Sequence, residues 1–232
     1  MAPGDSDGDR DAALDAVLDA YALKDERRTG WQLRGVDEPE SVAAHSWGVA
    51  YLVLALGDRF REDLPSVDLD HALRLAVVHD VAEAETGDVA TRAADVADRG
   101  SDVADHGDDA TRADPTADAA ERESKVAAER EAMAGLAGPL PERVRDAWEA
   151  YEARESPEAV LVKECDLLDT CLQAVIYERD GRYDPARGEP EAFREYEDLD
   201  EFFATSEPRL RTDAGRELFA AVRERYRAAR DE

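Results

Sequence analysis

Leu75-Ala-Val-Val-His-Asp-Val-Ala-Glu83 is the stretch of sequence that decides the fold. Apart from the adjacent His79 and Asp80 and the final Glu83, its residues are all apolar, as in a buried helix. Burying an imidazole beside a carboxylate costs free energy unless a cation or a partner compensates the two groups. A divalent cation would compensate them, and His45 and Asp166 offer one more nitrogen and one more oxygen ligand. The stretch therefore predicts a metal site in the core of a helical protein.

Apolar residues recur at the helical period on both sides of this stretch, and no segment alternates convincingly at the period of a strand. Ser41 is a plausible N-cap and Gly57 a stop for one helix, whereas Pro141 and Pro157 suit the first turn of two others. The prediction is an all-α protein, a helical bundle with the metal site in its core. The expected helices cover 11–24, 42–56, 69–84, 121–136, 141–153, 157–179, 190–203 and 213–229.

Three regions are expected along the chain. Residues 1–10 are acidic and predicted to be disordered, whereas 11–230 are predicted to form a single domain. Within that domain, about 92–120 are rich in Asp, Ala and Gly, which indicates an acidic low-complexity insertion. In the first expected helix, Leu14, Val17, Leu18 and Tyr21 fall on one face, as in an amphipathic helix.

The composition excludes some classes of partner. The net charge is −28, from 57 acidic and 29 basic residues, so a broad surface for duplex nucleic acid is not expected. A small phosphate-bearing substrate held in a local pocket is compatible with this charge. No run approaches about 18 apolar residues, and the acidic N-terminus lacks the apolar segment of a signal peptide. We therefore expect a cytoplasmic protein that does not enter a membrane.

The acidic surface and the two cysteines bear on the environment of the protein. A surface with Asp favoured and Lys rare is typical of adaptation to high salt, so we expect a source among halophilic archaea. Cys165 and Cys171 lie six residues apart on one expected helix, separated by about 9 Å of rise, and they face different sides. Free thiols are therefore expected, as in a reducing cytosol.

The predicted metal site also has the groups for catalysis. Two nitrogen and two oxygen ligands leave positions for water on a six-coordinate ion, and such an ion lowers the pKa of the water. Glu83, on the same expected helix as His79, would orient or deprotonate that water. The cofactor is expected to be a divalent ion, one of Mn, Co, Mg, Fe, Ni or Zn, and the ligand types do not choose among them.

The ordered set His45, His79-Asp80 and Asp166 resembles the metal motif of the HD-domain phosphohydrolase superfamily, and its flanks resemble the 5'-deoxynucleotidase branch. The resemblance covers about residues 12–228 without the acidic insertion. The matching stretches are Gly30-Trp31-Gln-Leu-Arg-Gly, Pro39-Glu-Ser-Val-Ala-Ala-His45-Ser, Val78-His-Asp-Val-Ala-Glu83-Ala-Glu-Thr-Gly-Asp88, Val162-Lys-Glu-Cys-Asp166-Leu-Leu-Asp and Leu199-Asp-Glu-Phe-Phe203.

The resemblance implies an all-helical, usually dimeric, metal-dependent enzyme that cleaves phosphate from deoxyribonucleoside 5'-monophosphates. It implies that His45, His79, Asp80 and Asp166 are the metal ligands. Glu83 and Asp88 would be the catalytic carboxylates.

The resemblance also implies substrate contacts. Trp31 would lie beside the sugar, where it could crowd out a ribose 2'-hydroxyl, and Arg28 or Arg27 would meet the phosphate. Ala44 stands where relatives often have an acidic residue, so the groups around His45 are expected to differ. Lys163 would contact the phosphate or neutralise the carboxylates of the site.

Less specific interpretations stand beside these. Asp169 is a rival to Asp166 as a ligand, Trp31 could be simple core, Glu83 a solvated acid and Asp88 an ordinary turn residue. His71 and His106 are read as residues without a metal role, and Trp148 and Tyr151 as core packing.

Two other functions remain open. One is another HD-type hydrolase, acting on a cyclic nucleotide, a nucleoside triphosphate or an alarmone. The other is a dimer that senses a nucleotide without turning it over.

Overall fold

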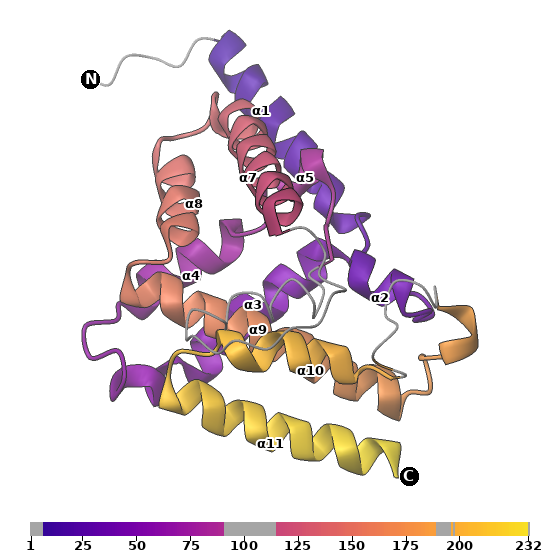
Figure 1. Ribbon diagram of the computed structural model, residues 1–232. Coiled ribbons are helices and arrows are strands. Elements are labelled where there is room, and N and C mark those ends of the chain that lie inside the picture. The colour runs from indigo at the N-terminus through magenta and orange to yellow at the C-terminus, as the bar shows by residue number, and fades with distance from the viewer. Residues whose placement is uncertain (1–6, 91–114, 189–195, 197, 232) are drawn as a thin grey trace.

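The computed structural model describes residues 7–90, 115–188, 196 and 198–231 (Figure 1). The described residues form helices joined by turns, with two isolated β-bridges and no sheet among them. The all-α prediction is therefore confirmed. In chain order, the α-helices are α1 (Asp7–Ala20), α2 (Thr29–Leu33), α3 (Val42–Leu56), α4 (Leu69–Val78), α5 (Glu83–Thr86), α7 (Pro115–Ala137), α8 (Arg143–Ala153), α9 (Pro157–Arg179), α10 (Asp200–Ser206) and α11 (Asp213–Arg230).

Helix α9 lies at the centre of the fold, between α3 and α4 on one side and α10 and α11 on the other (Figure 1). Ser156 caps it by accepting a hydrogen bond from the amide of Ala159, and Pro157 occupies its first turn. Its buried residues, among them Leu161, Cys165 and Leu168, join the main hydrophobic core. Because α9 is enclosed on most sides, polar residues on it must face a partner or a cavity.

The prediction of one helix over 69–84 is confirmed up to Val78 and is wrong beyond it. Helix α4 ends at Val78, residues 79–82 form turns, and the short helix α5 follows. The amides of Val81 and Glu83 bond to the carbonyls of Val78 and Asp80, three residues back, which is the tighter 3₁₀ pattern. Apolar periodicity does not reveal this change, because the backbone stays in the right-handed helical region, as at His79.

Other boundaries also differ from the prediction. Helix α1 begins at Asp7 and continues into a 3₁₀ turn, Tyr21–Lys24, and α8 begins at Arg143, so Pro141 precedes it. Helix α7 begins at Pro115, inside the range predicted as the acidic insertion, whereas 92–114 lie outside the described residues. Residues 1–6, and 189–195 of the helix expected over 190–203, lie outside them as well, and α10 begins at Asp200.

The apolar face of the first helix is not buried. Leu14, Leu18 and Tyr21 are more than half exposed, and Ala16 is the buried residue of α1. Helix α1 leans on α5 and α7, away from the main core (Figure 1). Small residues such as Ala16 bring the helices together there, so the larger apolar side chains point to solvent.

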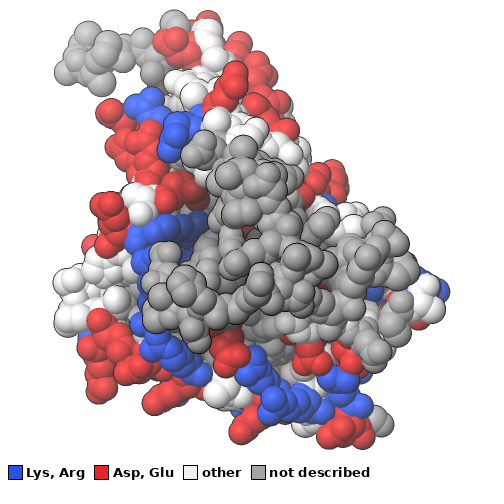
Figure 2. All heavy atoms as spheres, in the orientation of Figure 1, with Lys and Arg blue, Asp and Glu red and all other residues white. Residues whose placement is uncertain are grey.

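The surface is acidic, as the composition predicts. Figure 2 shows red Asp and Glu atoms over much of the described face, with blue Lys and Arg atoms in groups on the left side and along the lower edge, where α11 runs. None of the described helices combines the length and the apolar character needed to cross a membrane. Cys165 and Cys171 are buried and free, which confirms the prediction that they form no disulfide.

Candidate metal centre

His45 lies in the first turn of α3 and is fully buried. Ser41 accepts a hydrogen bond from the amide of Ala44, so the helix begins where the sequence predicts. The Nδ1 atom of His45 lies 2.7 Å from Oδ2 of Asp169 on α9. This bond directs the other ring nitrogen, Nε2, towards the centre of the molecule.

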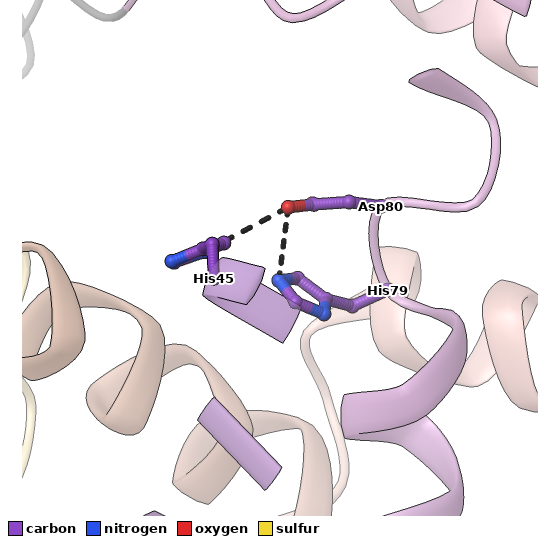
Figure 3. A group of neighbouring side chains, drawn as sticks. All are labelled: His45, His79 and Asp80. Atoms are coloured by element: carbon purple, nitrogen blue, oxygen red, sulfur yellow. Dashed lines mark ion pairs between the residues drawn. The ribbon is translucent and has the colours of Figure 1, made fainter. Parts of the chain in front are cut away.

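His79 and Asp80 approach the same point from the end of α4 (Figure 3). Nδ1 of His79 is 2.8 Å from the carbonyl oxygen of Ala76, to which it donates a hydrogen bond. Nε2 of His79 lies 3.1 Å from Oδ2 of Asp80, and Nε2 of His45 lies 3.7 Å from the same oxygen. The potential ligand atoms of these three residues all lie within 4.8 Å of one another.

The two Nε2 atoms fit a metal ion. Both are buried, and among the described residues neither has a hydrogen-bond partner. A buried nitrogen without a partner costs about 1–3 kcal/mol, so two of them converging on one carboxylate call for a compensating group. A divalent cation between two imidazoles and a carboxylate satisfies all three at once.

Asp166 and Asp169 project from α9, one turn apart, to opposite sides of His45. Oδ1 of Asp166 lies 3.2 Å from Nε2 of His45, whereas Asp169 lies at Nδ1. Oδ2 of Asp166 accepts hydrogen bonds from Lys163 and, at 3.4 Å, from the hydroxyl of Tyr151. The structure thus places Asp166 with the converging ligand atoms and Asp169 behind the imidazole.

The charges of the site shift several pKa values in the metal-free protein. Burial by itself lowers the pKa of His45, but the carboxylates of Asp166 and Asp169 raise it to about 10. Burial would raise the pKa of Asp80, yet the charges of His79, His45 and Arg28 hold it well below its usual range. Protonated imidazole and ionised carboxylate therefore coexist, which is the charge pattern that a cation would replace.

Arg28 lies between Asp80 of the metal centre and a further acid, Asp88. Its Nη1 atom lies 3.4 Å from Oδ2 of Asp80 and 3.4 Å from Oδ1 of Asp88. Asp88 is held by Thr29, whose amide donates to Oδ2 at 2.5 Å and whose hydroxyl donates to the carbonyl oxygen at 2.7 Å. Arg27, the alternative phosphate contact, instead donates to the carbonyl of Pro39 at the surface.

Glu83 is buried at the start of α5, and its Oε2 atom has no hydrogen-bond partner among the described residues. Burial, aided by the negative charges of Asp80 and Asp88, raises its pKa to about 9. A carboxylate with so high a pKa is a strong base when ionised, which suits proton abstraction.

Trp31 is buried, as the core interpretation expects, but it also lines a cavity of about 1380 Å³ that includes the metal centre. Its ring packs on Phe202 at 3.9 Å between centroids and meets Tyr177 edge-on at 5.2 Å. Its Nε1 atom donates to Glu40 at 3.1 Å. Lys163, Arg28, Glu83 and Asp88 line the same cavity.

The sequence does not predict the roles of several residues at the site. The sequence presents Asp169 as a rival ligand, whereas in the structure Asp169 orients the ring of His45. Tyr151 packs in the core, as predicted, but its ring also meets His79 edge-on at 5.2 Å, and its hydroxyl reaches Asp166. Gly48 leaves the space for Asp169, because a Cβ there would lie 2.1 Å from Oδ1. A glycine inside an apolar helix, three residues after a histidine, is the feature of the sequence that could have indicated a close neighbour at this position. His71, given no metal role, is exposed, and His106 lies outside the described residues.

The chain matches known proteins in sequence and in structure. The family model of the HD domain matches residues 20–204. The 5'-deoxynucleotidase HDDC2 of Danio rerio is 33% identical over 160 residues, which cover 67% of this chain and 64% of that protein. The human protein of the same name is 34% identical over 169 residues, covering 71% of this chain and 67% of that protein. The chain thus spans about two thirds of the length of these curated relatives.

A crystal structure of a Pyrococcus horikoshii OT3 protein has the same fold. It superposes with a TM-score of 0.62 at 29% identity and covers 92% of this chain and 98% of its own. The family model spans most of the chain, and the histidine and aspartate ligand atoms converge in its core. The chain belongs to the HD domain family.

Proposed function

We propose that this protein removes the 5'-phosphate of deoxyribonucleoside 5'-monophosphates and releases deoxynucleoside and orthophosphate. The observation that carries the proposal is the convergence on Asp80 of two buried imidazole nitrogens that make no hydrogen bond to the described residues, with Arg28 and Glu83 beside it in one cavity. The names of the curated relatives, 5'-deoxynucleotidases of the same family, support the choice of substrate.

His45, His79, Asp80 and Asp166 are proposed to hold one divalent ion, with Asp169 and the Ala76 carbonyl fixing the two rings. When bound, such an ion polarises a phosphoryl oxygen and lowers the pKa of a water molecule. The remaining chemistry falls to the side chains around it.

Arg28 is proposed to bind the phosphate, because its guanidinium lies between Asp80 and Asp88 and faces the cavity. Glu83 takes a proton from the attacking water, whose oxygen bonds to phosphorus as the bond to the 5'-oxygen breaks. The leaving 5'-oxygen becomes the alcohol by taking a proton from solvent, to which Glu83 returns the proton it removed from water. Asp88 positions Arg28, and Trp31 is proposed to lie beside the sugar, next to Phe202.

Phosphate release from a panel of dNMPs and matching NMPs tests the proposal, using protein loaded with Mn²⁺, Co²⁺ or Mg²⁺ at high KCl. We expect metal-dependent release from dNMPs that is lost in Asp80→Ala, and slower release from NMPs. No release from any dNMP by metal-loaded wild type would reject the proposal. If the panel gives no turnover but nucleoside triphosphates supplied in its place release pyrophosphate or triphosphate, the protein is another HD-type hydrolase. Tight nucleotide binding without turnover of any of these compounds would point to a sensor.

The protein is also proposed to be a homodimer, as the family resemblance implies. Trp47, Tyr51 and Leu54 form an exposed apolar face on α3, and the rings of Trp47 and Tyr51 stack at 5.3 Å. Apolar faces of this kind on an acidic surface commonly mark an interface. Sedimentation velocity should show a dimer that Tyr51→Glu converts to a monomer, whereas Tyr21→Glu in the 3₁₀ turn after α1, of similar exposure, leaves it intact. A dimer unaffected by Tyr51→Glu would place the interface elsewhere.

The prediction of salt adaptation rests on the net charge of −28. Repulsion among surface carboxylates should destabilise the fold at low ionic strength. Thermal unfolding in low and in molar KCl tests this, and an unchanged transition would contradict it.

A further inference from the structure

One end of the cavity gathers positive charge. Of the six Lys and Arg residues that line the cavity, four lie near one another, and we call this group the cationic end: Arg154, Lys163, Arg209 and Arg211. Glu152, Glu164 and Asp166 line the cavity beside these four cations, so this end of the cavity lacks the acidic excess of a chain of net charge −28. An anion in this position would therefore experience a field very different from that of the acidic surface.

Arg154 is held in an unusual way at this end. Its backbone is left-handed, with φ 56°, and its guanidinium lies 3.4 Å from the centroid of the Tyr151 ring. Nη2 donates to Glu152 at 3.3 Å, but Nη1 is buried and has no hydrogen-bond partner among the described residues. A buried donor left over on a strained backbone is costly, and such features cluster at binding sites.

The cationic end adjoins the metal centre. Lys163 donates to Asp166, and the hydroxyl of Tyr151, under Arg154, lies 3.4 Å from the same carboxylate. The charges of Arg209 and Arg154 both act on Lys163. Nη1 of Arg211 donates to the carbonyl of Arg154 at 3.2 Å, which ties the chain after α10 to the end of α8. A ligand at the metal centre therefore has these cations as its neighbours.

The cavity extends from aromatic to cationic residues along α10. Phe202, which packs on Trp31, lines one part of it, and Arg209, in the 3₁₀ turn after α10, lines another. The two residues are seven positions apart, which corresponds to roughly 10 Å along a helix. Thr205 and Ser206 line the cavity between the two. A nucleotide with its sugar at Trp31 could thus extend past the metal centre to the cations.

We propose that the cationic end is a subsite for a second phosphate group, beyond the phosphate at the metal centre. The inference rests on the proposed function, since it takes the nucleoside to lie at Trp31. The substrate class then includes deoxynucleotides that carry more than one phosphate. Free orthophosphate has the same chemistry, so the test separates the two sources.

Isothermal titration of metal-loaded protein tests the proposal. The probes are a deoxynucleoside 5'-phosphonate and the matching 5'-diphosphonate, in which carbon replaces each bridging oxygen, so that neither is hydrolysed. One additional charge-assisted contact should make the diphosphonate bind about tenfold more tightly. Arg209→Gln and, separately, Arg154→Gln should remove this preference and leave the dissociation constant of the phosphonate unchanged. Arg59→Gln, at an exposed position, should keep the preference.

Orthophosphate is then titrated into phosphonate-saturated protein. A further binding event that Arg209→Gln abolishes supports a subsite open to free phosphate. The absence of that event, together with a preference for the diphosphonate, supports a subsite for a phosphate of the substrate. Equal affinity for the two analogues and no binding of orthophosphate would overturn the proposal. Failure of the proposed function would appear separately, as absent dNMP turnover and no binding of the phosphonate, while Arg209-dependent binding of orthophosphate would still report on the subsite.

Discussion

The two sides of the metal centre are built differently. On one side, His45, Asp166 and Asp169 project from α3 and α9, regular helices of 15 and 23 residues with serine N-caps. On the other side, His79 and Asp80 lie where α4 ends and tighter turns begin. The regular side orients its imidazole with a side chain, Asp169, whereas the irregular side uses a backbone carbonyl, that of Ala76.

The difference follows from helix geometry. Residues three apart on a regular helix share a face and are separated by about 4.5 Å of rise, so Asp166 and Asp169 of α9 can flank the ring of His45. The adjacent His79 and Asp80 direct atoms to within 3.1 Å of each other at the end of a helix. We infer that both sides supply metal ligands and that the α4–α5 side also adds the group that reacts, Glu83.

Glu83→Gln should have the largest effect among variants that keep the metal, because it removes the base on the α4–α5 side. We expect the rate of phosphate release to fall about 10²–10⁴-fold, with metal content unchanged. Glu85→Gln, a neighbouring acid on α5, is the matched control and should stay near wild type. A comparable loss of activity in both variants would argue against a specific role for Glu83.

Asp169→Asn probes the α3–α9 side. An amide still fills the space but binds the Nδ1 position of His45 without a charge, so metal affinity should fall about 10–100-fold. Competition with a chelator measures this loss, and excess metal should restore much of the turnover. Asp180→Asn, at the exposed end of α9, should change neither quantity. Rescue by metal would distinguish weakened binding from damaged chemistry.

The two sides also differ in how far the sequence predicts them. The limits of α3 follow from Ser41 and Gly57, and the start of α9 follows from Pro157, because caps and prolines act locally. The end of α4 does not follow, since residues 75–83 are apolar in a helical pattern whether or not the chain tightens after Val78.

Among site residues, the convergence of His45, His79 and Asp80 agrees with the sequence-based expectation. The partners behind them are set by packing between helices that are distant in sequence. Tyr151 and Arg154 at α8 reach Asp166 and Lys163 at α9 only through the tertiary fold. The exposure of the apolar face of α1 could not be predicted for the same reason, because an amphipathic pattern does not say whether another surface covers that face.

Gly48→Ala should weaken the α3–α9 side indirectly. The new Cβ would lie 2.1 Å from Oδ1 of Asp169, so that carboxylate must rotate away from His45. We expect metal affinity to fall several-fold and global stability to change little, because alanine favours a helix by about 0.5–1 kcal/mol over glycine. Gly135→Ala, where the nearest atom lies at 3.6 Å, is the control. The double variant with Asp169→Asn should be no weaker than Asp169→Asn alone, and additive losses would contradict this coupling.

The smallest expected effect concerns stability in the metal-free protein. Burial and the charges of Asp80 and Asp88 raise the pKa of Glu83 to about 9, so the folded state holds this proton more tightly than the unfolded chain does. The free energy of unfolding should therefore fall, relative to that of Glu83→Gln, as the pH rises from the ordinary pKa of a glutamate towards about 9. Between about pH 6 and about pH 8 we expect a difference of about 1–2 kcal/mol in urea unfolding. Parallel profiles for the two proteins would show that Glu83 does not titrate in this way.

The central claim is that His45, His79, Asp80 and Asp166 hold one divalent ion. Anomalous diffraction at the absorption edge of manganese, from crystals grown with Mn²⁺, tests it most directly, because Glu40, His45 and Asp169 form a second group of possible ligands. We predict a single peak at about 2.0–2.3 Å from Nε2 of both histidines and the two carboxylates, a separation typical of first-row metal ligands. A peak at Nδ1 of His45 between Glu40 and Asp169, or none near His79, would contradict the account.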